Sequence, residues 1–303
     1  MSVAFKQKVL PWLQLCRAPA LFSAWADVLV GARIARDNWP PTETLIWLII
    51  STSGLYLSGM VFNDVADYQE DLAHRPFRHL PSGRISRRAA WFLAVILMGV
   101  GNLAAWFLSS QTGVCAGILS AAILAYDFGP RGNFLAFALM GLCRGLNLLL
   151  AVSTGTLPLA WILASALLPW MAAYFLYIFG VTWFARYETT DGKRPFLIGG
   201  IACVNLAILL WCGIILYLPR SIVRLGAGMI LLWILTRLDI RLWQIARNPT
   251  TQHVQSGVRA LLMAIIPIHS AWMLIITEDP YLAIGVLLLM VPARFLGRWM
   301  TIS

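Results

Sequence analysis

Apolar residues form long runs along this chain, and short polar segments separate the runs. Each run holds roughly 20 residues, the length that an α-helix needs to cross the hydrocarbon core of a bilayer. The pattern predicts a single all-α domain, a polytopic bundle of nine or ten transmembrane helices over residues 1–303. We expect the spans at about 17–36, 43–66, 89–109, 112–128, 133–153, 158–185, 196–218, 221–243, 256–276 and 280–297.

Basic residues are distributed unevenly over the predicted links. With the N-terminus in the cytoplasm, the cytoplasmic side holds all but five of the 23 Lys and Arg residues. Cytoplasmic links of membrane proteins collect Lys and Arg. We therefore expect an integral protein of a bacterial inner membrane with a cytoplasmic N-terminus. The same rule accounts for the net charge of +10 without nucleic acid as a partner.

Charge is most concentrated in "FNDVADYQEDLAHRPFRHLPSGRIS", residues 62–86. Its acidic part places Asp64, Asp67 and Asp71 at positions i, i+3 and i+7, which lie on one face of a helix. Three carboxylates on one face repel one another unless a cation lies between them. Hard oxygen ligands in such a group suit Mg²⁺, which commonly bridges a few carboxylates to substrate phosphates.

A plain structural interpretation of the same segment is open. A solvated helix end would hold these carboxylates in ordinary ion pairs with Arg75 and Arg78, which follow in the sequence. Glu70 lies off the shared face, so we leave it out of the predicted site.

A second and thinner charged cluster lies in "ARYETTDGKRPF", residues 185–196. It offers Glu188 and Asp191, followed by Lys193 and Arg194. By itself it is typical of an ordinary helix end. Four predicted crossings separate the two clusters, so both face the same side and could hold a metal-bound diphosphate between them. The guanidinium group of Arg can donate two parallel hydrogen bonds to phosphate oxygens, whereas Lys contributes a single point charge.

At these residues the chain resembles the UbiA superfamily of intramembrane prenyltransferases. The family carries NDxxDxxxD at the end of its second helix, and "NDVADYQED" at 63–71 matches every fixed position. Three further stretches resemble family landmarks: "LCRAPALF" at 15–22, "RPFRHLPSGRIS" at 75–86 and "YDFGPRGNF" at 126–134. "GLCRGLNLLL" at 141–150 looks most like an EboC-like branch of the family.

One position departs from the family pattern. The second family motif is DxxxD followed by a Gly-Lys type of loop, and Asp191 with "GKR" at 192–194 matches it. Tyr187 stands where the first Asp belongs, and Glu188, one residue further on, is the candidate replacement. The departure predicts an altered geometry for a second metal and weaker activity.

The resemblance implies a chemistry and a set of residues. A polyprenyl diphosphate would bind with its head at the cytoplasmic loops, and its prenyl group would pass to a lipid-soluble, aromatic acceptor in a water-free cavity. The implied Mg²⁺ ligands are Asn63, Asp64, Asp67, Asp71, Glu188 and Asp191, of which Asp64, Asp67, Asp71 and Asp191 carry the catalysis. The implied substrate-binding residues are Asn63, Arg75, Arg78, Tyr126, Arg131, Arg144, Asn147, Lys193 and Arg194.

Charged residues also lie deep within predicted spans. Arg144 and Asn147 fall near the middle of the span 133–153, and Asp27 falls near the middle of the first span. Charge at that depth is costly and marks a functional site by default. Asp27 and Arg144 have similar depths, so they could pair, and either a structural ion pair or a role in orienting the acceptor would account for them. His269 looks isolated in the sequence.

Two other functions are open at this point. A transporter or flippase of an anionic lipid would explain a basic pocket with a buried Arg144, but it would not require NDxxDxxxD at a helix end. A degenerate relative that binds prenyl diphosphate without turnover would explain Tyr187. The five cysteines form no CxxC and mostly fall in apolar runs, so we expect them to pack between helices.

Overall fold

The computed structural model describes residues 9–36, 38–130, 133–156, 167–186 and 194–299, and every element in these ranges is a helix. The helices are α1 (Leu10–Leu15), α2 (Ala18–Ile34), α3 (Thr42–Ala66), α4 (Tyr68–His74), α5 (Arg87–Leu108), α6 (Ser110–Phe128), α7 (Phe134–Val152), α9 (Leu167–Ala185), α10 (Arg194–Tyr217), α11 (Ile222–Arg247), α12 (Thr251–Thr277), α13 (Pro280–Leu288) and α14 (Met290–Trp299).

Long apolar helices make this an integral membrane protein. Within the described ranges, eight segments are long and apolar enough to cross a bilayer: α3, α5, α6, α7, α9, α10, α12 and the α13–α14 segment. Helix α2 has only 17 residues, and α11 carries several charged residues along its length, so neither is among the eight. The all-α prediction is confirmed, whereas a total of nine or ten spans stays a prediction.

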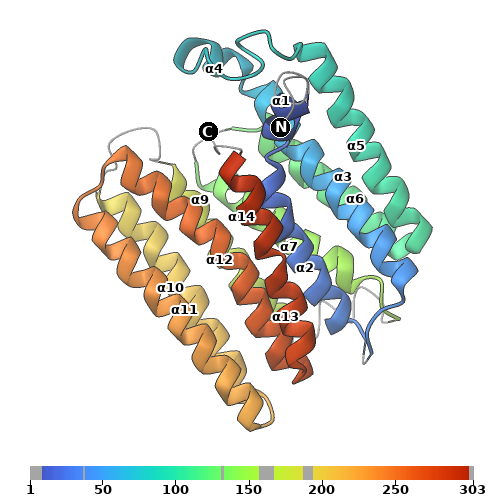
Figure 1. Ribbon diagram of the computed structural model, residues 1–303, viewed down its shortest axis with the longest axis vertical. Coiled ribbons are helices and arrows are strands. Elements are labelled where there is room, and N and C mark those ends of the chain that lie inside the picture. Colours follow the sequence, from blue (N-terminus) through green and yellow to red (C-terminus); the bar gives the residue numbers. More distant parts are fainter. Residues whose placement is uncertain (1–8, 37, 131–132, 157–166, 187–193, 300–303) are drawn as a thin grey trace.

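Helices α2 and α7 form the middle of the bundle (Figure 1). One core cluster joins side chains of α9 to α13 to Val30 of α2 and Leu148 of α7. A second core cluster joins α3 and α6 to Val28 and Leu149 of the same two helices. Because α2 and α7 contribute to both cores, polar groups on them can be enclosed from every side.

Two close glycine contacts hold neighbouring helices together. A Cβ atom at Gly54 of α3 would lie 2.6 Å from the carbonyl oxygen of Leu97 in α5. A Cβ atom at Gly180 of α9 would lie 2.7 Å from the carbonyl oxygen of Gly200 in α10. Small residues let helix backbones approach closely in membranes, where burial of apolar surface adds little.

Aromatic contacts show which helix ends lie together. Phe62, near the end of α3, packs on Phe128 at the end of α6, with ring centroids 5.8 Å apart. Phe134 starts α7 and packs on Trp183 near the end of α9, with ring centroids 4.9 Å apart. The ends of α3, α6 and α9 and the start of α7 therefore share one end of the bundle, where α1 and α4 also lie (Figure 1).

Candidate active site

The acidic motif lies where α3 passes into α4. Helix α3 ends at Ala66, and Asp67 separates it from α4, which begins at Tyr68. The ψ angle of Asp67 is −2°, far from the value of about −42° in a regular α-helix. The helix that the sequence predicts through all three carboxylates is therefore interrupted at the middle one. The chain turns at the middle carboxylate, and Asp64 and Asp71 approach a common point from either side of the turn.

That common point is a guanidinium group. The Nη1 atom of Arg78 lies 2.8 Å from Oδ2 of Asp71 and 4.0 Å from Oδ1 of Asp64. Arg75 also reaches Asp71, with 3.5 Å between its Nη1 and Oδ1. The ion pairs of the plain structural interpretation are thus present. They also show that two carboxylates converge on a single position occupied by positive charge.

Arg17 approaches the same carboxylates from the start of α2. Its backbone is left-handed, with φ 47°, and this turn directs the chain from α1 into α2. Its Nη2 atom lies 3.3 Å from Oδ1 of Asp64 and 3.5 Å from Oδ1 of Asn63. We did not place Arg17 in the site from the sequence, although the "LCRAPALF" landmark contained it.

Asp127 is a further residue that sequence reasoning missed. It is buried near the end of α6, and the side chain of Asn63 donates a hydrogen bond to it. Its neighbour Tyr126 was in the predicted site, so adjacency was the available signal. Asp127 adds a carboxylate to those of Asp64 and Asp71 at this end of the bundle. We call the residues that meet here the mouth cluster: Arg17, Asn63, Asp64, Asp71, Arg75, Arg78 and Asp127.

His79 borders the mouth cluster in the loop between α4 and α5. Partial burial lowers its pKa below the ordinary value, and the nearby Arg84 lowers it further, whereas Asp64 opposes both effects. The imidazole is therefore neutral at pH 7, and the positive charge of the mouth cluster comes from arginines.

The donor chemistry of the mouth cluster fits Mg²⁺ in part. Carboxylate oxygens are the ligands that Mg²⁺ prefers, and it is usually held by one or two carboxylates together with substrate phosphates and water. Asp64 and Asp71 already converge on the cationic Nη1 of Arg78. Within the described ranges, however, no three acidic, His or Cys side chains are grouped closely enough to hold a metal by themselves. A metal here would share its coordination with a phosphate group.

Four predicted site residues lie outside the described ranges, and so does Tyr187 of the second motif: Arg131, Glu188, Asp191 and Lys193. Arg194 is described as the exposed first residue of α10. The end of α9 lies at the same end of the bundle as the mouth cluster, as the Phe134–Trp183 contact shows. The expected meeting of the two charged clusters stays a prediction, because the second cluster lies mostly outside the described ranges.

A cavity of about 60 Å³ extends from the mouth cluster into the bundle. Tyr126 and Asp127 lie on its wall, as do Arg144 and Asn147. Its remaining lining is mostly apolar, from Leu55, Met60, Leu119, Ile123 and Met140 with Tyr56 among them. The predicted residues Tyr126, Arg144 and Asn147 are therefore brought together on one cavity.

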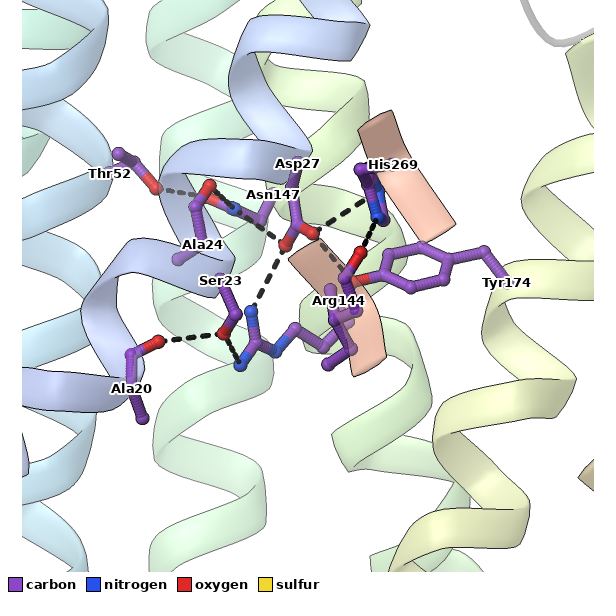
Figure 2. A network of polar contacts seen from close by, with 10 residues as sticks. Ala20, Ser23, Ala24, Asp27, Thr52, Arg144, Asn147, Tyr174 and His269 are labelled. Atoms are coloured by element: carbon purple, nitrogen blue, oxygen red, sulfur yellow. Dashed lines mark hydrogen bonds and ion pairs between the residues drawn. The ribbon is translucent and has the colours of Figure 1, made fainter. Parts of the chain in front are cut away.

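Behind the cavity wall, Asp27 is the centre of a buried polar network (Figure 2). Its side chain is completely buried. Arg144 donates from Nη1 to Oδ2 of Asp27 over 3.1 Å and from Nη2 to Oγ of Ser23 over 2.9 Å. Asn147 donates from Nδ2 to Oδ2 of Asp27, also over 3.1 Å. The predicted pairing of Asp27 with Arg144 is confirmed.

The far side of Asp27 belongs to the other half of the bundle. The hydroxyl of Tyr174 in α9 donates to Oδ1 of Asp27 over 2.6 Å. Nε2 of His269 in α12 lies 3.4 Å from the same oxygen, so the description of His269 as isolated is wrong. Asp27 thus joins four helices, α2, α7, α9 and α12, through one carboxylate. We call this set the Asp27 network: Ser23, Asp27, Arg144, Asn147, Tyr174 and His269.

Arg144 connects the Asp27 network to the cavity. Its guanidinium carbon lies 5.4 Å from the centre of the Tyr56 ring, a cation–π contact with a cavity-lining side chain. Thr52 donates a hydrogen bond to the side-chain oxygen of Asn147. Polar groups at the inner end of an otherwise apolar cavity are thereby held in fixed orientations.

Comparison with known proteins agrees with this arrangement. The profile of the UbiA prenyltransferase family matches residues 24–245. This chain belongs to that family. The matched range includes Asp27, the acidic motif and Arg144, so the Asp27 network and the mouth cluster lie largely within the part that UbiA proteins share.

Individual UbiA relatives match over shorter stretches. A digeranylgeranylglyceryl phosphate synthase of Pyrococcus furiosus is 35% identical over 33% of this chain and 36% of its own length. A 4-hydroxybenzoate octaprenyltransferase of Azotobacter vinelandii is 32% identical over 60% of this chain and 57% of its own length. The chain thus spans between about a third and somewhat more than half of these curated relatives.

Solved structures of UbiA homologues share the fold. The apo structure of a homologue from Aeropyrum pernix has a TM-score of 0.66 at 18% identity, over 84% of this chain and 97% of that one. A homologue from Archaeoglobus fulgidus bound to GPP and Mg²⁺ has a TM-score of 0.58 at 13% identity, over 91% and 99% of the two chains. At these identities the likeness shows the UbiA-like fold alone.

Proposed function

We propose that this protein is a Mg²⁺-dependent intramembrane prenyltransferase that moves a prenyl group from its diphosphate to a lipid-soluble, aromatic acceptor. The observation that carries the proposal is the continuity between the mouth cluster and the apolar cavity, because Tyr126 and Asp127 border both. A prenyl diphosphate has the same two-part character, a multiply charged head and an apolar tail. The names of the curated relatives and the GPP and Mg²⁺ in a homologue's structure support the same chemistry.

The mouth cluster and the neighbouring Asp67 would hold the diphosphate head. Asn63, Asp64, Asp67 and Asp71 would hold Mg²⁺ together with phosphate oxygens, and Glu188 and Asp191 would add ligands from the second motif. Bound Mg²⁺ supplies positive charge that stabilises the developing diphosphate anion. Arg17, Arg75 and Arg78 would turn from their carboxylate partners to the phosphate oxygens, and Arg131, Lys193 and Arg194 would join them.

The cavity would hold the tail and exclude water. Breaking the bond between the prenyl carbon and the diphosphate oxygen leaves an allylic cation, which water would capture if it were present. The ring faces of Tyr56 and Tyr126 lie on the cavity wall, where they can stabilise that cation. Arg144 and Asn147 would orient the acceptor, whose ring carbon forms the new bond and releases a proton.

Location and topology belong to the same proposal. The positive-inside bias supports a cytoplasmic N-terminus and cytoplasmic mouth cluster in a bacterial inner membrane. Water-soluble prenyl diphosphate head groups would then reach the mouth cluster from the cytoplasm, while the acceptor arrives through the bilayer.

Diphosphate release is the decisive measurement. The protein, purified in nanodiscs, is mixed with Mg²⁺, labelled prenyl diphosphates of several lengths and candidate phenolic acceptors. We expect Mg²⁺-dependent release that Asp64→Ala and Asp67→Ala abolish. Glu278→Gln is a matched control, because Glu278 pairs with Arg224 in a separate ion pair away from the mouth cluster.

Two results would favour the other functions. Tight binding of prenyl diphosphate without release would indicate a non-catalytic binder, in line with Tyr187 in the second motif. Transfer of an intact labelled lipid diphosphate across the bilayer would indicate a transporter. Either result would overturn the proposed prenyl transfer.

A further inference from the structure

Helix α11 is long enough to cross the membrane although it carries several charges. It packs against α10 on one side and α12 on the other, and both neighbours are apolar enough to span a bilayer. The links before and after it, 218–221 and 248–250, are short. Its 26 residues correspond to about 39 Å of helix, more than the roughly 30 Å hydrocarbon core.

Two arginines of α11 face away from the protein. Arg237 and Arg241 are both exposed and stand four residues apart, on one face of the helix. Trp233 and Ile240 on the same face are 66% and 51% exposed. The opposite face, with Leu231, Leu235, Leu238 and Leu242, is buried in the core. The arginines therefore point towards lipid.

Neither arginine has a carboxylate partner among the described residues. From residue 192 to residue 277 the sequence contains a single acid, Asp239. Asp239 accepts a hydrogen bond from Nδ2 of Asn205 in α10 over 2.9 Å, and its position two residues from each arginine turns it to the other side of the helix. The outward face of α11 thus carries two uncompensated positive charges.

The two arginines also lie below the membrane surface. Arg224 marks one end of the span, where it pairs with Glu278 over 2.9 Å. About 20 residues, the length of the hydrocarbon core, lead from there to Gln244. Arg241 then lies about 4 Å and Arg237 about 10 Å inside that boundary. Charged side chains that face lipid at such depth are rare and need a partner.

We propose that Arg237 and Arg241 form a binding site for an anionic phospholipid, whose phosphate group accepts hydrogen bonds from both guanidinium groups. Guanidinium groups bind phosphate oxygens as a fork, and neighbouring positions four residues apart lie about 5–6 Å from one another, within reach of one head group. One acyl chain of the lipid lies along Ile240 and Trp233. The site is independent of the proposed prenyl transfer.

Lipid binding to two charge variants tests this site. The delipidated protein is titrated with phosphatidylglycerol or with phosphatidylcholine of the same acyl chains, and bound lipid is counted by native mass spectrometry while Tm is recorded. Wild type should bind phosphatidylglycerol preferentially, and its Tm should rise when this lipid binds. The double variant Arg237→Gln/Arg241→Gln should lose most of both effects. Its side chains are exposed, so its Tm in phosphatidylcholine should match wild type.

Arg294→Gln/Arg298→Gln is the matched control, because these arginines of α14 are also exposed and four residues apart. It removes the same charge and should still bind phosphatidylglycerol preferentially and show the rise in Tm. Arg237→Lys/Arg241→Lys keeps the charge without the fork and should retain part of it.

Four results would overturn the proposal. The first two are an equal loss of phosphatidylglycerol binding in the α11 and α14 variants, and equal binding of phosphatidylglycerol and phosphatidylcholine by wild type. The third is a rise in Tm with inorganic phosphate in detergent that equals the rise with phosphatidylglycerol. The fourth is a loss of self-association in the α11 variant with unchanged lipid binding. The last result would indicate a contact with a second copy of the chain.

Discussion

The mouth cluster and the Asp27 network use the same side-chain chemistry in opposite surroundings. Each combines carboxylate, guanidinium and a carboxamide, from Asp64, Arg78 and Asn63 in one and from Asp27, Arg144 and Asn147 in the other. In the mouth cluster the arginines come from helix ends and a loop, and two of them are partly accessible, with side-chain exposures of 31% for Arg17 and 30% for Arg75. In the Asp27 network every group comes from a helix interior, and the carboxylate is fully buried.

This difference predicts different roles. Partly exposed ion pairs such as those of Arg17 and Arg75 contribute little to stability, so these arginines can exchange their carboxylate partners for a substrate at low cost. A buried carboxylate with several donors is costly to disturb, because removing one partner leaves an uncompensated charge. The mouth cluster is therefore suited to bind and release an anion, and the Asp27 network is suited to hold helices and cavity walls in place.

The largest effect on stability should come from Asp27→Ala. The substitution leaves Arg144 buried without its carboxylate, and we expect the free energy of unfolding to fall by about 3–5 kcal/mol. Thermal unfolding in detergent measures the loss. The double variant Asp27→Leu/Arg144→Met removes both charges and should recover much of it. An Asp27→Ala protein that keeps its Tm but loses turnover would instead assign the pair to the substrate.

Asp64→Ala should separate the two regions most clearly. We expect diphosphate release to fall by about 100-fold or more, equivalent to about 2.7 kcal/mol of transition-state stabilisation. The free energy of unfolding should change by less than about 1 kcal/mol, since Arg17 is 31% exposed and can reach water, and Arg78 keeps its pair with Asp71. A Tm loss as large as that of Asp27→Ala would contradict the comparison.

Tyr174→Phe tests the connection between the halves of the bundle. It removes the hydroxyl that donates to Oδ1 of Asp27 and leaves the ring packing unchanged. Hydrogen bonds to charged groups contribute about 1.5–3 kcal/mol, and we expect a loss near the lower value. Tyr126→Phe, at the mouth of the cavity, is the comparison variant. If both variants unfold at the wild-type temperature, Asp27 does not depend on its contact with α9.

The smallest expected effect concerns pH and His79. Its pKa in the folded protein is below the ordinary value of 6.5 because burial and Arg84 disfavour the charged form. The neutral form therefore contributes stability that is fully present above the unfolded pKa and is lost as the pH falls below it. Wild type should lose slightly more Tm than His79→Asn between pH 7 and pH 5.5. Equal losses in the two proteins would show that His79 does not report on the mouth cluster.

Much of the fold was predictable because hydropathy is local information. The apolar runs located the long helices to within a few residues, as for α3 at Thr42–Ala66 and α12 at Thr251–Thr277. The acidic motif was visible because its spacing is written in the sequence. The equal depth of Asp27 and Arg144 predicted their pairing, since both depths can be counted from the helix ends.

The partners of each charge were decided only by the tertiary structure. No local pattern states that the chain turns at Asp67, that Arg17 reaches Asp64 from the start of α2, or that His269 in α12 faces Asp27. These contacts join residues far apart in the sequence, and they depend on how each helix is rotated and packed against its neighbours. Hydropathy determines which segments enter the bilayer, whereas side-chain packing between the segments determines which charges meet there.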